Sequence, residues 1–99
     1  MLNIKKTVEN GSCVFFLEGR LDTVTASDLD SELKGVIDGL EELVFDLSGL
    51  DYISSAGLRV LLVAQKTMSR QGRMRVCGVN ETIMEIFDVT GFSDILTIE

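Results

Sequence analysis

The chain has no histidine, and this absence excludes a large class of chemistry. Histidine is the commonest general base in enzymes and the proton carrier of most catalytic triads, so sites of that kind are ruled out. Cysteine is also scarce. Cys13 and Cys77 lie far apart in the sequence, and two cysteines without a histidine do not make a zinc site. Each cysteine lies within an apolar, strand-like run of residues, which predicts a reduced core residue rather than a disulfide.

Other common signals are missing as well. The glycines are scattered and form neither GxxxxGK[ST] nor GxGxxG, so no nucleotide or other cofactor is expected. No apolar run approaches the roughly 20 residues that span a bilayer, and the first residues lack the apolar core of a signal peptide. Proline, repeats and linkers are absent, and a length of 99 residues predicts one domain over residues 1–99.

Positive charge is in the minority. Nine lysine and arginine residues stand against 16 aspartate and glutamate residues, which gives a net charge of −7 at pH 7. An acidic surface repels nucleic-acid phosphates and anionic lipids, so no direct nucleic-acid binding and no membrane insertion are expected. These features together predict a cytoplasmic, non-enzymatic protein that acts through a protein partner.

The apolar periodicity predicts strands alternating with helices. The expected strands cover residues 2–6, 12–18, 43–47, 73–77 and 95–98. Of the expected helices, the first is capped by Thr25 with Asp28 in a capping-box position, and its apolar face reaches Leu40. The second runs from about Ala56 to Ser69, and a short third helix follows Asn80. The order β-β-α-β-α-β-α-β favours an α/β fold with a mixed, mainly parallel sheet that starts with an antiparallel pair.

The most informative segment is DYISSAGLRVLL, from Asp51 to Leu62. An apolar β-type run precedes it and a helical pattern follows, so Ser54 or Ser55 is expected to be the helix N-cap. A phosphate on a serine at this position would face unpaired backbone N–H groups and the positive end of the helix dipole, so the fold can accept its charge. The residues alone leave two interpretations open, a cap only or a cap beside a phosphorylation site.

Three segments in this order, LDTVTA, LVFDLSGLDYISSAGLRVLL and FDVTGFSDIL, resemble the STAS domain. More narrowly, the chain resembles the bacterial anti-sigma factor antagonists. In that family an Asp-x-Ser-Ser/Thr-Gly-Leu-type turn carries the serine that a partner kinase phosphorylates. Matching on Gly57 and Leu58 places that serine at Ser55, with Ser54 in place of the family's aspartate and Ala56 in place of its second hydroxyl residue. Ser54 is therefore the second choice for the phosphorylated residue.

The resemblance implies helices clustered on one side of the sheet and a regulatory switch. The unphosphorylated protein would bind a serine-kinase anti-sigma factor and so free a sigma factor. Phosphorylation would break the complex, and a serine phosphatase would restore it; ATP belongs to the kinase. The implied partner-binding residues are Asp22, Thr23, Ser54, Ser55, Gly57 and Arg59.

Three of these residues have an alternative interpretation. Asp22 lies in the loop before the first helix, where it is also explained as a solvated loop acid or an Asx-turn. Gly57 lies inside a predicted helix, where it is explained by a close partner backbone or by crowding against the sheet. Arg59 follows Ser55 by one turn and either pairs with a phosphate or belongs to a solvated face.

Two rival functions are considered. One is a constitutive accessory subunit of a lipid-transport or multi-STAS signalling complex, which the loss of the aspartate at position 54 favours. The other is a small-molecule hydrolase or nucleotide binder, against which the missing histidine and phosphate loops argue.

Overall fold

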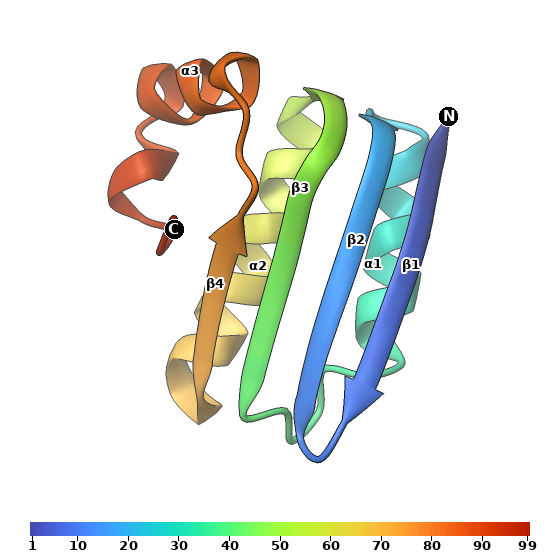
Figure 1. The fold of residues 1–99 in the computed structure, drawn as a ribbon. Coiled ribbons are helices and arrows are strands. Elements are labelled where there is room, and N and C mark those ends of the chain that lie inside the picture. The colour runs from blue at the N-terminus through green and yellow to red at the C-terminus, as the bar shows by residue number, and fades with distance from the viewer.

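The computed structural model describes all 99 residues (Figure 1). In chain order its elements are β1 (Leu2–Glu9), β2 (Ser12–Leu21), α1 (Thr25–Lys34), β3 (Glu42–Ile53), α2 (Ser55–Gln71), β4 (Arg73–Cys77), α3 (Glu81–Thr90) and a 3₁₀ turn, Phe92–Asp94. The sheet order is β1-β2-β3-β4. The β1–β2 pair is antiparallel, whereas β2–β3 and β3–β4 are parallel. The predicted mixed, mainly parallel sheet is therefore confirmed.

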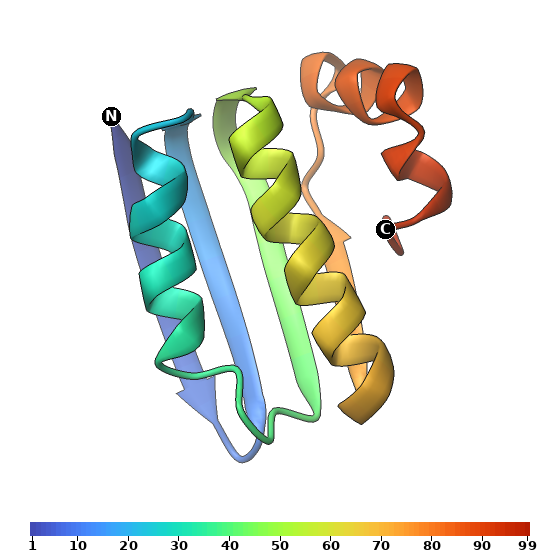
Figure 2. The same ribbon diagram turned by 180° about the vertical axis from the view of Figure 1, so that it is seen from behind.

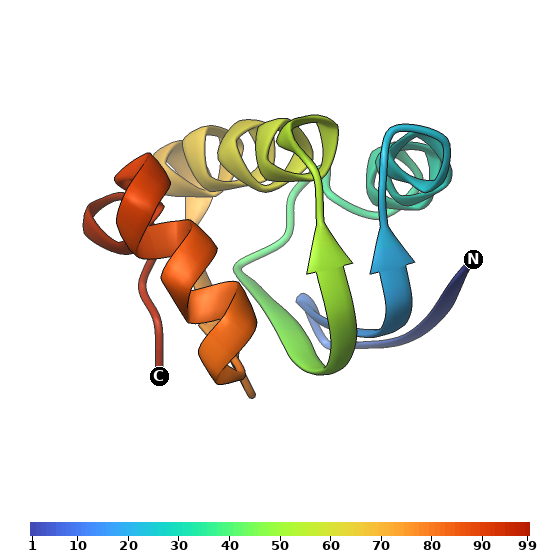
Figure 3. The ribbon, with the colours of Figure 1, turned by 90° about the horizontal axis from the view of Figure 1, so that it is seen from above.

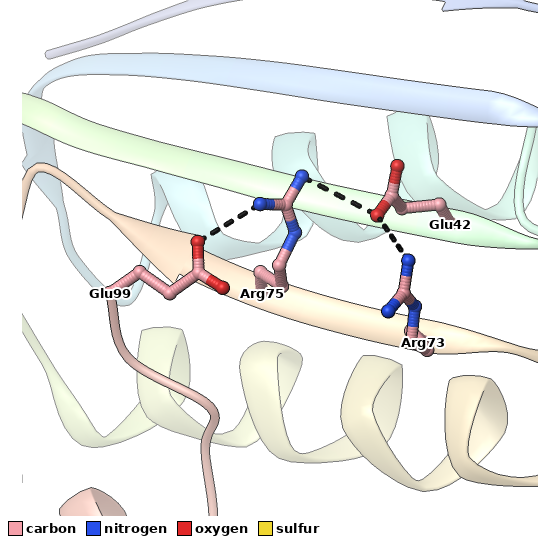
Figure 4. Close-up of polar contacts among 4 residues, drawn as sticks. All are labelled: Glu42, Arg73, Arg75 and Glu99. Atoms are coloured by element: carbon pink, nitrogen blue, oxygen red, sulfur yellow. Dashed lines mark hydrogen bonds and ion pairs between the residues drawn. The ribbon is translucent and has the colours of Figure 1, made fainter.

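Helices α1 and α2 pack on the same face of the sheet, as Figures 2 and 3 show. Alternate strand residues face them and build the core, in which the rings of Phe15 and Phe45 stack with centroids 5.5 Å apart. The opposite face carries no helix. Its β3–β4 end is polar: Glu42 pairs with Arg73 and Arg75, and Arg75 also contacts Glu99 (Figure 4).

The first helix differs from the prediction at both ends. Thr25 is the first helical residue rather than the cap, and Val24 at the cap position makes no side-chain cap bond. The carboxylate of Asp22 caps the helix instead. Its Oδ1 atom accepts the N–H groups of Val24 and Thr25, both at 3.0 Å. The helix ends at Lys34, so Leu40 reaches the core through a turn.

The prediction of a final strand over residues 95–98 is also wrong. Only one bridge forms, between Val76 and Ile98. The 3₁₀ turn causes this, because its bonds continue to Leu96, whose N–H donates to the Phe92 carbonyl, and leave few extended residues. The observed order is thus β-β-α-β-α-β-α.

Other boundaries agree with the sequence more closely. β4 covers residues 73–77 as predicted. Asn80 caps α3, and Gly91 ends it in the left-handed conformation. β3 is longer than expected and passes through Ser48 and Gly49 to Ile53, with pairing irregularities opposite it in β2. This extension carries β3 directly to the start of α2.

Candidate functional site

The candidate site lies where β2 and β3 end together. The two strands are parallel, and their last paired residues are Leu21 and Ile53. The chain leaves both strands at the same edge, so the residues that follow them meet there. A hydrogen bond joins the two exits, from the Ser54 N–H to the Leu21 carbonyl oxygen at 2.8 Å. The loop with Asp22 and Thr23 therefore lies beside the two serines.

The two serines have different surroundings. Ser54 is partly buried and is the N-cap of α2, since its Oγ atom accepts the Gly57 N–H at 3.3 Å. Ser55 is the first helical residue; it is exposed, and its hydroxyl group makes no hydrogen bond within the chain. Because Ser54 provides the cap, the hydroxyl of Ser55 is free to react with or contact a partner.

Asp22 is held in place by the start of α1. Its carboxylate accepts the two backbone N–H groups and the Thr25 hydroxyl, the latter at 3.1 Å. The Thr25 hydroxyl is also 2.8 Å from the Arg20 carbonyl oxygen. The Thr25 N–H contributes most to holding the pKa of Asp22 below its usual value, and the Thr25 hydroxyl and the Val24 N–H act in the same direction. The site thus presents a fixed, ionised carboxylate in the loop that follows Leu21, to which Ser54 is hydrogen-bonded.

Gly57 is buried where the first turn of α2 packs against the ends of the strands. A Cβ atom there would lie 2.7 Å from Cγ of Leu21 and 2.9 Å from Cγ1 of Ile53. Crowding against the sheet accounts for the glycine, and the contact of Gly57 with a partner stays a prediction. Gly57 instead lets the first turn of α2 approach the strand ends closely.

Thr23 and Arg59 are both exposed near the serines. Arg59 forms none of the ion pairs found in the chain. The sequence interpretation missed a neighbouring pair: the guanidinium of Arg20 lies 4.3 Å from the ring centroid of Tyr52. These two residues face each other across β2 and β3. This contact could be predicted only from the register of β2 and β3, because 31 residues separate Arg20 from Tyr52 in the sequence.

Both cysteines are free thiols. Cys13 is buried in β2, and Cys77 is partly buried at the end of β4. In each case burial is the main cause that raises the pKa of the thiol. A raised pKa lowers the thiolate fraction, so neither thiol is activated as a nucleophile.

A separate observation is that no helix is long and apolar enough to cross a membrane.

Comparison with known proteins defines the class of this fold and site. The sequence model of the STAS domain matches residues 3–99, so the chain belongs to the STAS domain family. Within that family it groups with the anti-sigma factor antagonists. The Bordetella bronchiseptica protein BtrV, which is assigned to them, is 38% identical over 90% of this chain and 78% of its own length.

Solved structures agree on the fold. An anti-sigma factor antagonist from Mycobacterium paratuberculosis superposes with a TM-score of 0.88 at 22% identity, covering 99% of this chain and 85% of that one. The Bacillus protein SpoIIAA in its phosphorylated form gives a TM-score of 0.74 at 16% identity, covering 100% of this chain and 91% of that one. SpoIIAA is also known in its unphosphorylated form, which gives a TM-score of 0.75.

Proposed function

We propose that this protein is a cytoplasmic, non-enzymatic anti-sigma factor antagonist controlled by phosphorylation of Ser55. The unphosphorylated form binds a serine-kinase anti-sigma factor and frees the sigma factor. Phosphorylation by that kinase, with its own ATP, ends the binding, and a serine phosphatase reverses it. The main support is the exposed, unbonded hydroxyl of Ser55 at the start of α2, beside the fixed carboxylate of Asp22.

The physical effect of the phosphate is local. At pH 7 it adds about −1.5 to −2 charges. At the first residue of α2 the free backbone N–H groups tolerate that charge, so the fold persists. In a packed interface the same charge loses water, which costs several kcal/mol without a matching cation. A loss of about 3 kcal/mol weakens binding more than a hundredfold. The switch therefore needs no large conformational change.

The serine at position 54 is compatible with this proposal. Ser and Asp are N-caps of similar strength, and Ser54 accepts the Gly57 N–H as an aspartate would. The replacement keeps the geometry of the turn and removes one negative charge. It is also the observation that favours the second candidate, a constitutive accessory subunit of a lipid-transport or signalling complex that is never phosphorylated.

One experiment separates the two candidates. The protein is incubated with its cognate kinase and ATP, and the phosphate is mapped by mass spectrometry. The switch predicts one phosphate on Ser55. A phosphate on Ser54 would move the site by one residue, and no incorporation with an active kinase would favour the constitutive subunit.

A further inference from the structure

Thr25 is the only buried residue of the chain that carries a hydroxyl, amide or charged side chain. Its Oγ1 atom has three polar neighbours in the segment just before it. It accepts the Asp22 N–H at 2.8 Å, and it lies 2.8 Å from the Arg20 carbonyl oxygen and 3.1 Å from Oδ1 of Asp22. A hydroxyl group has one hydrogen, so the carbonyl and the carboxylate share it. The hydroxyl is therefore bonded to the chain both as a donor and as an acceptor.

Packing alone does not require a hydroxyl at this position. Thr25 is buried on α1 together with Ala26, Leu29 and Leu33. Valine has nearly the same shape and would fill the space without a polar atom. A buried hydroxyl costs free energy unless its hydrogen bonds are made, so what it contributes depends on the groups that it holds. These groups all belong to residues 20–22, at the end of β2 and the start of the loop.

The segment that Thr25 holds is also the one that is bonded to the start of α2. Leu21 lies between Arg20 and Asp22, and its carbonyl oxygen accepts the Ser54 N–H at 2.8 Å. Residues 20–22 are thus fixed on one side by the Thr25 hydroxyl and on the other by Ser54. Their position decides how the Asp22 carboxylate lies relative to the serine pair.

The two carboxylate oxygens of Asp22 have different surroundings. Oδ1 accepts the N–H groups of Val24 and Thr25 and contacts the Thr25 hydroxyl. Oδ2 takes part in no hydrogen bond or ion pair of the chain, and the residue is partly exposed. The bonds to Oδ1, that of the Thr25 N–H first, hold the pKa of Asp22 below its usual value and keep the group ionised. The carboxylate is held through one oxygen, and the other is available to a partner.

We propose that Thr25 is a positioning residue of the partner-binding site. Its hydroxyl holds the loop so that Oδ2 of Asp22 meets a hydrogen-bond donor of the serine-kinase anti-sigma factor. The inference rests on the proposed function and adds to it a residue that touches no partner, because Thr25 is buried. A charged acceptor that is already fixed in place loses little conformational freedom when it binds a donor. Freeing the loop should therefore weaken binding although every contact residue is unchanged.

Three single variants test the hydroxyl. Thr25→Val removes it and keeps the shape, Thr25→Ser keeps it and removes the methyl group, and Ser27→Ala is the matched control. Ser27 lies in the same turn, and its exposed hydroxyl donates to the Val24 carbonyl oxygen at 2.9 Å without touching Asp22. Calorimetric titration with the purified cognate kinase should give a Kd about fivefold higher or more for Thr25→Val. Thr25→Ser and Ser27→Ala should bind as wild type does, at a temperature where thermal unfolding shows all variants to be folded.

Two further measurements separate positioning from a general loss of structure. Carbon NMR of the Asp22 carboxyl between about pH 7 and pH 3 should show a raised pKa in Thr25→Val, because one bond to the charged form is lost. The same pKa should be unchanged in Ser27→Ala. In addition, the loss of affinity in Thr25→Val should not add to that in Asp22→Asn, because Thr25 acts through Asp22.

The outcomes distinguish this inference from the proposed function. If Thr25→Val binds the kinase as wild type does, or if its loss adds in full to that of Asp22→Asn, Thr25 is not a positioning residue. Binding by Thr25→Ser as weak as that by Thr25→Val would assign the effect to the methyl group and overturn the proposal, as would an unchanged pKa of Asp22 in Thr25→Val. Each of these results leaves the switch intact. If the wild-type chain does not bind the kinase at all, the proposed function fails and this inference fails with it.

Discussion

Asp22 is at once an acid beside the proposed phosphorylation site and the cap of α1. Its carboxylate needs its negative charge for the bonds to Val24 and Thr25, which is why its pKa is lowered in the folded chain. A lowered pKa means that the stabilisation is present above the unfolded value, about 3.9, and is lost as the pH falls through the folded value. The acid thus makes the site pH-sensitive only under acidic conditions.

This linkage predicts the behaviour of Asp22→Asn. The variant should be less stable than wild type at pH 7, and the difference in the free energy of unfolding should shrink as the pH approaches the folded pKa. Urea unfolding between about pH 7 and pH 3 measures it. Asp51→Asn is the control, because Asp51 is exposed and its side chain makes no hydrogen bond. A difference for Asp22→Asn that does not depend on pH would contradict the capping role.

Gly57 gives a prediction in which two effects oppose each other. Alanine is favoured over glycine inside a helix by about 1 kcal/mol. The added Cβ atom would, however, meet Leu21 at 2.7 Å and Ile53 at 2.9 Å, and these contacts involve carbons near the middle of buried side chains. Overpacking of this kind costs about 1–3 kcal/mol, so steric conflict should win and Gly57→Ala should be destabilised.

Thermal or urea unfolding measures that change, with Gly35→Ala as the matched control. Gly35 has ordinary helical φ and ψ angles, and a Cβ there would lie no closer than 3.5 Å to Glu32. This control should be neutral or more stable by up to about 1 kcal/mol. If Gly57→Ala gained stability as well, crowding against the sheet would not explain the glycine.

At the scale of elements, the sequence predicted those features that depend on neighbouring residues. Alternation and caps located β4 and α3 almost to the residue, because Asn80 and Gly91 act within one turn of their own chain. The two errors are local as well. The cap of α1 is the carboxylate of Asp22, two or three residues before the N–H groups that it accepts, and a 3₁₀ turn at Phe92–Asp94 takes residues from the predicted last strand.

The candidate site divides in the same way. The serine pair at the start of α2 could be predicted from local chemistry. The approach of Asp22 to Ser54 depends on the parallel register of β2 and β3, so the sequence indicated it only through a family resemblance.

Asn80 predicts how α3 is attached to the rest of the fold. Its Oδ1 atom accepts the Ile83 N–H at 2.9 Å, and its Nδ2 group donates to the Leu50 carbonyl oxygen at 2.7 Å. Asn80→Ala removes both the cap and this link, and should lower the free energy of unfolding by about 2 kcal/mol. Hydrogen exchange should accelerate in α3 and not in the β1–β2 pair. Thr82→Ala, at an exposed position of the same helix, is the control; equal effects would contradict a role for the cap.

At the scale of the whole molecule, the fold separates stability from the switch. Most of the core lies between the sheet and helices α1 and α2, whereas Ser55 lies outside it at the edge where β2 and β3 end. A change of charge at Ser55 can therefore alter binding and leave the fold unchanged. Three variants test this separation: Ser55→Ala, Ser55→Asp and Ser54→Ala.

Ser55→Ala should lose phosphorylation but keep the wild-type affinity for the kinase, because the unmodified surface is the binding form. Ser55→Asp should fold well, since a carboxylate suits the first turn of a helix, yet it should bind far more weakly because the interface must desolvate its charge. Ser54→Ala should still accept phosphate and should lose about 1 kcal/mol of stability with the cap. Calorimetric affinity, phosphate incorporation and thermal unfolding are measured for all three. If Ser55→Asp binds as wild type does and neither serine is modified, the fold serves a constitutive subunit and the switch is disproved.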